Sequence, residues 1–413
     1  MNEILNLLNP WWFNRRFETG IERPQYTFRL LKSLGHKRVV LLVGSRRVGK
    51  TTLLHQTIAK LIEKNVPPHH ILYALMDHPQ ISTSKIYDLV REFRKQFNLD
   101  RKEKIYLFFD EIQYISNWER EIKALFDTEN VKIFLSGSAS SRLIIKSPYL
   151  TGRLEKIDVN PLDFNEFLTF RKAKISEIEP YKLEKYTDEY LKLGGYPEYV
   201  LTKDPSYFSD LVNNILFKDI INLYKLKNPQ FLKDLILLLS DRVGHRTTFT
   251  KLASILSLKM DTVKKYMFYL ENTFLIDELP RFTSSRGARV YGPKKFYLWD
   301  NGILFNLLGK LSYGQAFEQT VFNFLKTKYN LGFYYENQKE VDFVVRKNGK
   351  TELWEAKYKI NEENRKQNLD NYLKIAKRQK AGKIVFVTKD FEKKSKIDNI
   401  TIQYTPLWKL MTN

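Results

Sequence analysis

The 413-residue sequence contains no cysteine, which excludes disulfides, thiolate zinc sites and cysteine nucleophiles together. It also has no run near the ~20 apolar residues that a membrane-spanning helix needs. The stretch Asn9–Phe13 is apolar but short, and it lacks both a basic leader and a small-residue cleavage site. We therefore expect a cytoplasmic protein with no membrane partner.

Acidic residues are outnumbered by basic ones, 47 against 69, and the net charge is +22. Such an excess suits a polyanionic partner, of which nucleic acid is the commonest. A lysine-rich solvated surface is the alternative explanation. The hydrophobic content of 43% is that of a globular protein, and the length allows two or three domains with separate cores.

The strongest local signal is a glycine-bounded stretch between the apolar run Val39–Val43 and a helical pattern. It fits G-x-x-x-x-G-K-[ST], and its residues are Gly44, Ser45, Arg46, Arg47, Val48, Gly49, Lys50 and Thr51, with Thr52 following. Backbone N–H groups in such a loop point at an anion on the positive end of the helix. We expect ATP here, with Lys50 at the β- and γ-phosphates and Thr51 on Mg²⁺. A glycine-rich turn without a ligand is the alternative.

A second apolar run, residues 105–109, ends in Asp110 and Glu111. Buried parallel strands carry ligand-binding groups at their carboxyl ends, which predicts a strand with two carboxylates at the ligand edge of a sheet. In that geometry Asp110 holds Mg²⁺ through water, and Glu111 orients and deprotonates the attacking water. An acid pair that caps the next helix is the ordinary alternative, but the phosphate loop in the same chain favours catalysis.

Two more polar residues follow strand-like or turn-like patterns. Ser136 lies near the end of the run 132–138, where it is placed to touch the γ-phosphate or the water. Arg153 follows Gly152 and is a candidate arginine finger that stabilises charge on the transferring phosphoryl group. An arginine paired with a surface acid explains Arg153 equally well.

The middle of the chain is helical from about 165 to 227, with breaks at Gly194-Gly195 and Pro197. We expect this stretch to form a helical lid over the nucleotide. Next, the patterns at 248–256 and 261–270 predict a helix-turn-helix, and the strands at 275–279 and 296–299 complete a winged helix. Such a module contacts DNA or protein, and its outer lysines favour DNA.

Beyond Gly314 the pattern is helix, strand, strand, helix, strand, with Glu318 near the start of the first helix. Asn348-Gly349 between the two middle strands is the strongest short hairpin signal, a type I′ turn. Counting back from this turn pairs Phe343 with Trp354 and Asp342 with Glu355. The same alternation places four polar side chains on one face of the hairpin, namely Glu340, Asp342, Glu355 and Lys357.

Opposed carboxylates with Cβ atoms ~5 Å apart repel one another, so this register requires a cation between Asp342 and Glu355. A divalent metal is the candidate that the residues suggest, either Mg²⁺ or Mn²⁺ in its place.

The order of motifs resembles the prokaryotic AAA-type P-loop ATPases that are fused to an uncharacterised C-terminal domain. The resemblance rests on the phosphate loop, on Asp110–Gln113, and on the stretches 135–138, 150–153 and 160–168, and it covers most of residues 20 to 345. The sequence departs from the family in having no clear lid arginine of the second-sensor type.

The resemblance implies an α/β fold in four parts. They are a doubly wound P-loop domain (1–160), a helical lid (161–230), a winged helix (231–293) and a restriction-endonuclease-like domain (294–413). It also implies a homo-oligomer or a nucleotide-driven association, because AAA-type sites often borrow an arginine from a neighbour.

The spacing D-x12-E-x-K resembles the PD-(D/E)xK nuclease core, with Val341 in place of the proline. The resemblance implies that Asp342 and Glu355 hold the metal, that Lys357 positions the hydrolytic water, and that Glu318 is an additional acid. We therefore expect an ATPase that acts on DNA through a nuclease-like domain. The alternatives are an ATP-dependent switch that binds DNA or protein with a silent nuclease fold, and a partner-binding regulator that turns ATP over slowly.

Overall fold

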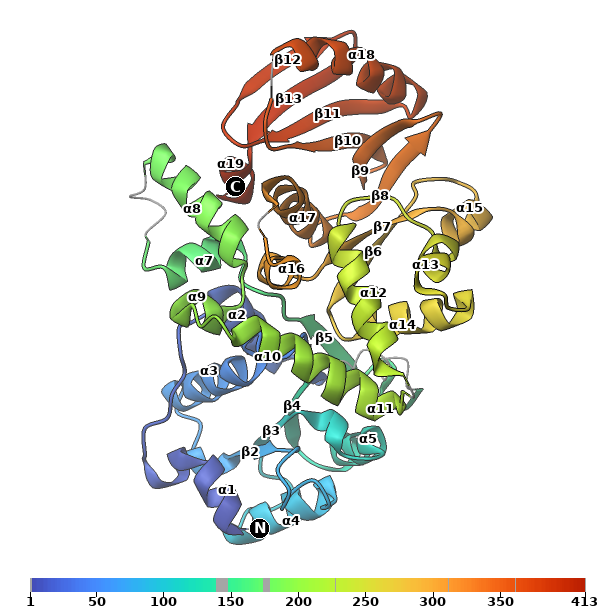
Figure 1. The fold of residues 1–413 in the computed structure, drawn as a ribbon. Helices are drawn as coiled ribbons and strands as arrows, with labels where there is room; N and C mark the ends of the chain where they lie inside the picture. The colour runs from blue at the N-terminus through green and yellow to red at the C-terminus, as the bar shows by residue number, and fades with distance from the viewer. Residues whose placement is uncertain are drawn as a thin grey trace. The chain divides into compact units, whose positions relative to one another are not determined.

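The computed structural model describes residues 2–138, 148–173, 179–226, 228–310, 312–360 and 362–412. The chain divides into two compact units, Met1–Asn160 and Pro161–Asn413 (Figure 1). In the described residues the first unit has one sheet and the second has two, and each unit has its own buried core.

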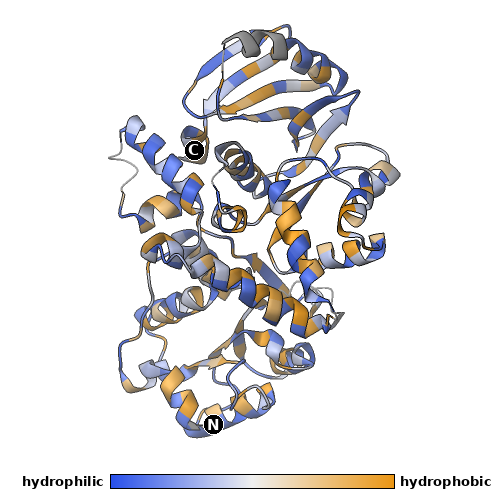
Figure 2. Cartoon of the chain, in the orientation of Figure 1, coloured by the Kyte–Doolittle hydropathy of each residue, from blue (hydrophilic) through white to orange (hydrophobic). Residues whose placement is uncertain are grey.

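The first unit is built on a five-stranded sheet in the order β2-β3-β4-β1-β5, and every neighbouring pair is parallel. Its strands are β1 (Val39–Val43), β2 (Ile71–Leu75), β3 (Ile105–Asp110), β4 (Val131–Gly137) and β5 (Leu154–Asp158). All residues of β1 are buried, as expected for a central parallel strand covered on both faces. The apolar colour of these strands is visible in Figure 2.

Helices connect these strands and carry their apolar residues on one side. They are α1 (Asn2–Leu8), α2 (Pro24–Lys32), α3 (Lys50–Glu63), α4 (Ile86–Gln96) and α5 (Trp118–Thr128). Short 3-10 turns are η1 (Pro10–Phe13), η2 (Ser33–Gly35), η3 (Pro68–His70), η4 (Ile112–Tyr114) and η5 (Pro148–Leu150). In α4 the buried residues recur at helical spacing, at Ile86, Leu89, Val90 and Phe93.

The apolar stretch near the N-terminus covers the edge strand β2. Asn9 Nδ2 donates to Tyr73 O at 2.9 Å, and Tyr73 N donates to Asn9 Oδ1 at 2.7 Å, so the amide replaces a neighbouring strand. The indole N–H groups of Trp11 and Trp12 both donate to Ile71 O. These bonds satisfy backbone groups that an open sheet edge would leave unpaired.

The second unit begins with helices and a two-stranded antiparallel sheet. The helices are α7 (Phe164–Phe170), α8 (Pro180–Leu193), α9 (Pro197–Thr202), α10 (Tyr207–Asn214), the π-helical η7 (Ile215–Ile221), α11 (Asn222–Tyr224), α12 (Pro229–Asp241), α13 (Phe249–Leu256), α14 (Met260–Asn272), α15 (Arg286–Tyr291) and α16 (Asn301–Leu308). The strands are β6 (Ile276–Pro280) and β7 (Lys294–Leu298). The two helices and the two strands expected for the winged helix are therefore present as α13, α14, β6 and β7.

The residues expected to form a lid fold as part of the second unit. Asp300 connects this stretch to the rest of the second unit. Its Oδ2 accepts from Gly195 N and its Oδ1 accepts from Gly302 N, both at 2.7 Å. A side chain at Gly194 would have its Cβ 1.9 Å from Asp300 Oδ1, so the chain approaches Asp300 as closely as only glycine allows.

The C-terminal part of the second unit is a six-stranded mixed sheet in the order β12-β13-β11-β10-β9-β8. Its elements are α17 (Tyr313–Lys326), β8 (Asn330–Glu336), β9 (Lys339–Lys347), β10 (Lys350–Lys357), α18 (Glu362–Arg378), β11 (Ala381–Thr388), β12 (Lys393–Ile397), β13 (Ile400–Pro406) and α19 (Leu407–Thr412). Three strands lie between α17 and α18 where the sequence predicted two. The missed strand β8 contains Asn330 and Gly332, residues that disfavour strands by propensity.

Candidate nucleotide site and buried acid cluster

The phosphate loop joins β1 to α3, as its sequence predicts. Gly44 has no room for a side chain, because a Cβ there would lie 2.3 Å from Val159 O. Gly49 has a φ of 95° and directly precedes the helix. Lys50 is buried, and its Nζ donates to Gly44 O at 3.0 Å and to Ser45 O at 2.9 Å. The loop thus curls around its own ammonium group.

The other loop residues fix the shape of this turn. Val48 is fully buried, and its carbonyl accepts from Arg23 Nη1 at 3.0 Å. Ser45 is buried, Arg47 has a left-handed φ of 61°, and Arg46 donates to the Tyr114 hydroxyl at 3.1 Å. Thr52 is half-buried in the first turn of α3.

Thr51 and Asp110 meet at the carboxyl edge of the sheet. Thr51 Oγ1 lies 2.5 Å from Asp110 Oδ2, although 59 residues separate them. Asp110 also accepts from Ser136 Oγ and from the Tyr73 hydroxyl, the latter at 2.9 Å. A hydroxyl and a carboxylate are the oxygen ligands that Mg²⁺ takes in phosphate sites, so these two residues fit the metal.

Tyr73 is a site residue that the sequence did not reveal. Burial and then the Asp110 carboxylate raise the pKa of its phenol far above the ordinary value of 10.0. The phenol therefore remains protonated and can only donate to Asp110. Its one sequence signal is a tyrosine within an otherwise aliphatic strand.

Glu111 stands beside the loop lysine in a strained backbone position. Its φ is 55°, its N donates to Ser136 Oγ at 3.0 Å, and Oε1 lies 3.9 Å from Lys50 Nζ. Burial raises the pKa of Glu111, and Asp110 adds to the increase against the opposing charge of Lys50. Gln113 Nε2 donates to Glu111 Oε2 and to Ser138 Oγ, which holds the carboxylate in place. A carboxylate whose pKa is raised is suited to accept a proton near neutral pH.

Arg153 does not reach the phosphate loop of its own chain. Its carbonyl accepts from Val39 N at 2.8 Å, so it lies at the start of β5, which runs parallel to β1. The loop follows the other end of β1, five residues and roughly 16 Å away along the strand. Arg153 Nε instead lies 3.1 Å from Asp127 Oδ1. In this structure Arg153 forms the surface ion pair that was the alternative explanation, and its role as a finger stays a prediction.

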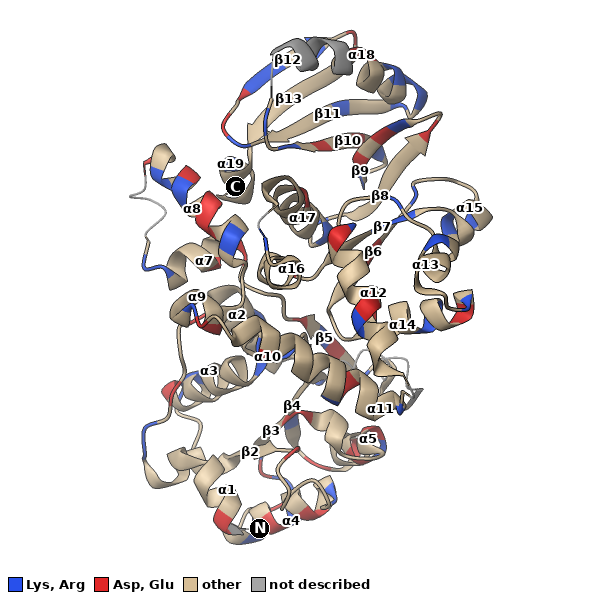
Figure 3. Cartoon of the chain, viewed as in Figure 1, with Lys and Arg blue, Asp and Glu red and all other residues tan. Residues whose placement is uncertain are grey.

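The β9–β10 hairpin has the register that the turn predicted. Lys347 faces Lys350 and Phe343 faces Trp354. Beyond that pair, Asp342 N donates to Glu355 Oε2 at 3.0 Å, and Ala356 N donates to Asp342 Oδ2 at 3.1 Å. Both carboxylates are buried together, and the acidic residues of the two strands are visible side by side in Figure 3.

The two opposed acids are neutralised by two different lysines, Lys295 at Asp342 and Lys357 at Glu355. Lys295 of β7 is 1% exposed, and its Nζ lies 2.9 Å from Asp342 Oδ1, 2.8 Å from Glu340 Oε1 and 3.2 Å from Glu318 Oε1. Lys357 Nζ lies 2.8 Å from Glu355 Oε1. We call this set the acid cluster, and its members are Lys295, Glu318, Glu340, Asp342, Glu355 and Lys357.

The expected metal ligands Glu318, Asp342 and Glu355 do not fit a divalent ion in this arrangement. An ammonium group bonds two of them, and the structure holds no group of three or more His, Cys, Asp or Glu suited to a metal within the residues it describes. Within the described residues a separate lysine contacts each of Asp342 and Glu355, so no single cation bridges them, and Mg²⁺ or Mn²⁺ at this position is not supported. Lys295 lies 47 residues before Asp342 in the chain, so no local pattern connects the two.

The carboxyl groups of the acid cluster differ in pKa. Burial favours a raised pKa for Asp342, but Lys295 and Lys357 outweigh it and the pKa is lowered. Burial, together with the neighbouring Asp342, raises the pKa of Glu318 and of Glu355 to about 7. Burial opposes the charge of Lys295, yet the surrounding acids raise its pKa well above 10.5. The cluster therefore contains a charged Lys295–Asp342 pair flanked by two carboxyls that hold protons easily.

Family comparisons agree with the site in the first unit. Residues 36–168 match the model of the family described as AAA domain. The matched stretch contains the parallel sheet and the phosphate loop, so the first unit is similar to AAA domains in sequence and has a P-loop α/β fold. Residues 184–313 match a domain of unknown function (DUF8612), and residues 313–410 match another (DUF4143).

Similar proteins extend over nearly the whole chain. An uncharacterized protein of Haemophilus influenzae is 27% identical over 402 residues, covering 94% of this chain and 98% of that protein. The uncharacterized protein MJ1544 of Methanocaldococcus jannaschii is 29% identical over 398 residues, covering 90% and 88%.

Solved structures show lower similarity. The Walker-type ATPase PABY2304 of Pyrococcus abyssi has a TM-score of 0.43 and 16% identity, with 72% of this chain and 99% of that one covered. AMPPCP-bound DnaA from Aquifex aeolicus has a TM-score of 0.32 and 16% identity, with 62% and 89% covered. Scores this low carry no inference about this chain. None of the helices in the described residues is long and apolar enough to cross a membrane.

Proposed function

We propose that the chain binds ATP with Mg²⁺ at the phosphate loop and hydrolyses it. The observation that carries the proposal is the 2.5 Å contact between Thr51 Oγ1 and Asp110 Oδ2. It brings the hydroxyl that ends the loop motif onto the carboxylate that ends β3, and Glu111, the next residue, lies 3.9 Å from Lys50 Nζ.

Each residue has a role that follows from its position. Mg²⁺ held by Thr51 and Asp110 would neutralise charge on the β- and γ-phosphate oxygens. Lys50 exchanges its loop carbonyls for phosphate oxygens, since an ammonium bonds more strongly to a charged acceptor. Glu111 accepts the proton of the attacking water. Ser136 positions both acids, because its Oγ accepts from Glu111 N and donates to Asp110 Oδ1.

Two substitutions test this proposal in the full chain. We expect Lys50→Ala to lose nucleotide binding, and Glu111→Gln to keep binding but lose at least about a hundredfold in turnover, as for removal of a general base. Binding is measured with a fluorescent ATP analogue and turnover by phosphate release. Glu119→Gln, at a half-buried position on α5, is the matched control for the charge change. Equal hydrolysis by wild type and Glu111→Gln would remove Glu111 from the mechanism.

We propose that the second unit binds nucleic acid and that its acid cluster does not cut it. Support for a nuclease-like fold comes from the element order α17-β8-β9-β10-α18-β11, with the acids on the central hairpin. Support for a silent site comes from Lys295, which bonds two of the three expected ligands. This favours the switch hypothesis, in which ATP turnover controls a binding platform, over an ATP-dependent nuclease.

We also propose that the active form is a homo-oligomer. The nearest candidate finger, Arg153, lies at the sheet edge opposite to its own phosphate loop. An arginine so placed can serve only the site of another copy, and it is 38% exposed.

A further inference from the structure

A cavity of about 390 Å³ opens beside the acid cluster of the second unit. It is lined chiefly by His245, Arg246, Thr247, Thr248, Lys251 and Glu340. The lining combines two permanent cations, a histidine and two hydroxyls with a single carboxylate. That donor set is suited to an oxyanion.

The segment that carries these residues is fixed to β7. Thr247 and Lys294 exchange backbone hydrogen bonds of 2.9 and 2.8 Å, and Gly244 N donates to Phe296 O at 3.2 Å. Gly244 has a φ of 77°, and a Cβ there would lie 2.6 Å from Glu318 Oε1. The wall of the cavity is therefore held against the acid cluster by backbone contacts, which preorganises it for a ligand.

Thr247 has a buried hydroxyl without a partner. The residue lines the cavity and is 3% exposed, yet Oγ1 forms no hydrogen bond. A buried hydroxyl left unpaired costs about 1–3 kcal/mol, and such groups in native proteins usually have a ligand or water as partner. Thr248 beside it caps α13, since Lys251 N donates to Thr248 Oγ1 at 3.1 Å.

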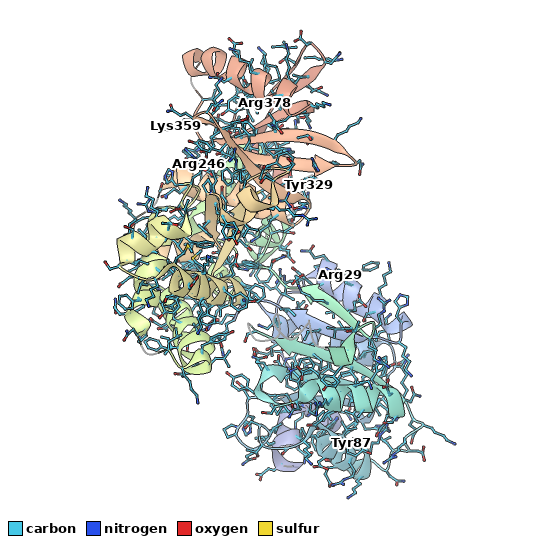
Figure 4. All side chains as sticks on the ribbon, turned by 90° about the vertical axis from the view of Figure 1, so that its right-hand side faces the viewer. Arg29, Tyr87, Arg246, Tyr329, Lys359 and Arg378 are labelled. Carbon is cyan, nitrogen blue, oxygen red and sulfur yellow. The ribbon has the colours of Figure 1, made fainter. Side chains whose placement is uncertain are left out.

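Two cations face the ligand position from different elements. The ammonium of Lys251 is exposed and has no ion pair within the described part of the chain. Arg246, labelled in Figure 4, lies over the Tyr335 ring at 3.4 Å and donates to Glu340 Oε2 at 2.5 Å. A stacked guanidinium keeps its remaining N–H groups in one plane, available for a second acceptor.

Glu340 connects the cavity to the acid cluster. One carboxylate oxygen binds Arg246, and the other lies 2.8 Å from Lys295 Nζ. Glu340 can keep its bond to Arg246 Nε while the remaining N–H groups of the guanidinium bond an anion.

We propose that this cavity binds a phosphate group of a nucleic-acid strand, held by Arg246, Lys251 and the Thr247 hydroxyl. The inference rests on the proposal that the second unit binds nucleic acid, and it names the site. The net charge of +22 favours a polynucleotide over a small phosphate compound, because long-range attraction acts on every phosphate of a strand. The flat Arg246–Tyr335 pair beside the cavity offers a surface on which a base can stack.

The test uses the full chain in the Lys50→Ala background, which removes the phosphate loop as a competing site. Binding of a fluorescent single-stranded 12-mer is measured by anisotropy at several salt concentrations, with inorganic phosphate as a separate arm. The variants are Lys251→Gln and Thr247→Val, and Lys396→Gln on the exposed strand β12 is the matched charge control.

We expect Lys251→Gln to weaken binding at least threefold more than Lys396→Gln, and to reduce the salt slope by about 0.7, one phosphate on a single strand. Thr247→Val should weaken binding as well but leave the salt slope unchanged, because it removes a neutral donor. Its thermal midpoint should not fall, since the hydroxyl has no partner to lose.

Three results would overturn the site. If the Lys50→Ala chain binds the 12-mer and neither variant differs from Lys396→Gln, the phosphate lies elsewhere while the binding proposal stands. If no oligonucleotide binds at all, the proposed function fails together with the site. If inorganic phosphate protects the protein thermally but the 12-mer does not compete, the ligand is a small phosphate compound and the strand is excluded.

Discussion

Burial acts differently on two ionisable residues, Lys295 within β7 and Asp300 two residues after its end. Lys295 has three carboxylates around it and is charged. Asp300 has two backbone N–H donors but no ion pair within the described residues. Burial therefore raises the pKa of Asp300 to about 6, although both hydrogen bonds favour its charged form.

The raised pKa of Asp300 predicts a pH dependence with a definite sign. Its pKa lies above the ordinary value of 3.8, so the folded state binds the proton more tightly than the unfolded state. Proton binding by Asp300 therefore adds to the free energy of unfolding. The added stability is complete below about pH 4 and is lost as the pH rises through about 6, a change of about 3 kcal/mol.

We expect Asp300→Asn to remove this dependence. The amide loses one of the two N–H bonds at every pH, so the variant is less stable than wild type at about pH 4. The difference between wild type and variant in the free energy of unfolding should then become smaller toward about pH 7. Urea unfolding at several pH values between about 4 and 7 measures this difference. Asp261→Asn, at a side chain 93% exposed, is the control. Parallel curves for wild type and Asp300→Asn would show that Asp300 is not the titrating group.

At the scale of elements, strand direction decides which residues share a site. Residues at the carboxyl ends of β1, β3 and β4 meet, which is how Lys50, Asp110 and Ser136 come together. Arg153 at the amino end of β5 is excluded by the same parallel arrangement.

The position of Arg153 makes a trans role testable by mixing variants. We expect Arg153→Ala to hydrolyse ATP about a thousandfold more slowly than wild type, the low end for loss of a finger. Adding Glu111→Gln protein, which keeps its arginine, should restore turnover at the Arg153→Ala sites, measured by phosphate release against protein concentration. Arg91→Ala on α4, at a side chain 54% exposed, is the control. Wild-type activity for Arg153→Ala would eliminate this arginine, and no recovery on mixing would count against the trans arrangement.

At the scale of the whole molecule, the excess of basic residues predicts how the chain binds nucleic acid. Each phosphate that a lysine or arginine neutralises releases condensed counterions. Affinity for duplex and single-stranded DNA should therefore fall linearly on a log–log plot against salt, by roughly tenfold or more between 50 and 200 mM. Neither Mg²⁺ nor Mn²⁺ should lead to cleavage of either substrate, because Lys295 bonds the acids.

Variants on two basic surfaces separate specific from general attraction. Changing both Lys264 and Lys265 on α14 to Ala should weaken binding to all sequences alike. Changing both Lys394 and Lys396 on β12 to Ala removes the same charge and should have a smaller effect. Binding is measured by anisotropy and cleavage by gel. Salt-independent binding would refute the electrostatic account, and a metal-dependent cut would refute the silent acid cluster.

The sequence by itself determined the features that depend on neighbouring residues. The phosphate loop, the acid pair 110–111 and the β9–β10 register follow from local patterns, because glycine conformation, strand burial and turn type act over a few residues. The same patterns predicted that Asp342 and Glu355 lie opposite one another and need cationic partners.

Only the tertiary structure decided which distant residues complete these sites. Lys295 comes to the acids from a strand of another sheet, Tyr73 reaches Asp110 from the adjacent strand, and Arg153 is carried to the far edge by strand direction. The physical reason is that a buried charge selects its partner by distance and orientation in the folded core. Distance and orientation depend on how sheets and helices pack, so they cannot be read from residue type and local spacing alone.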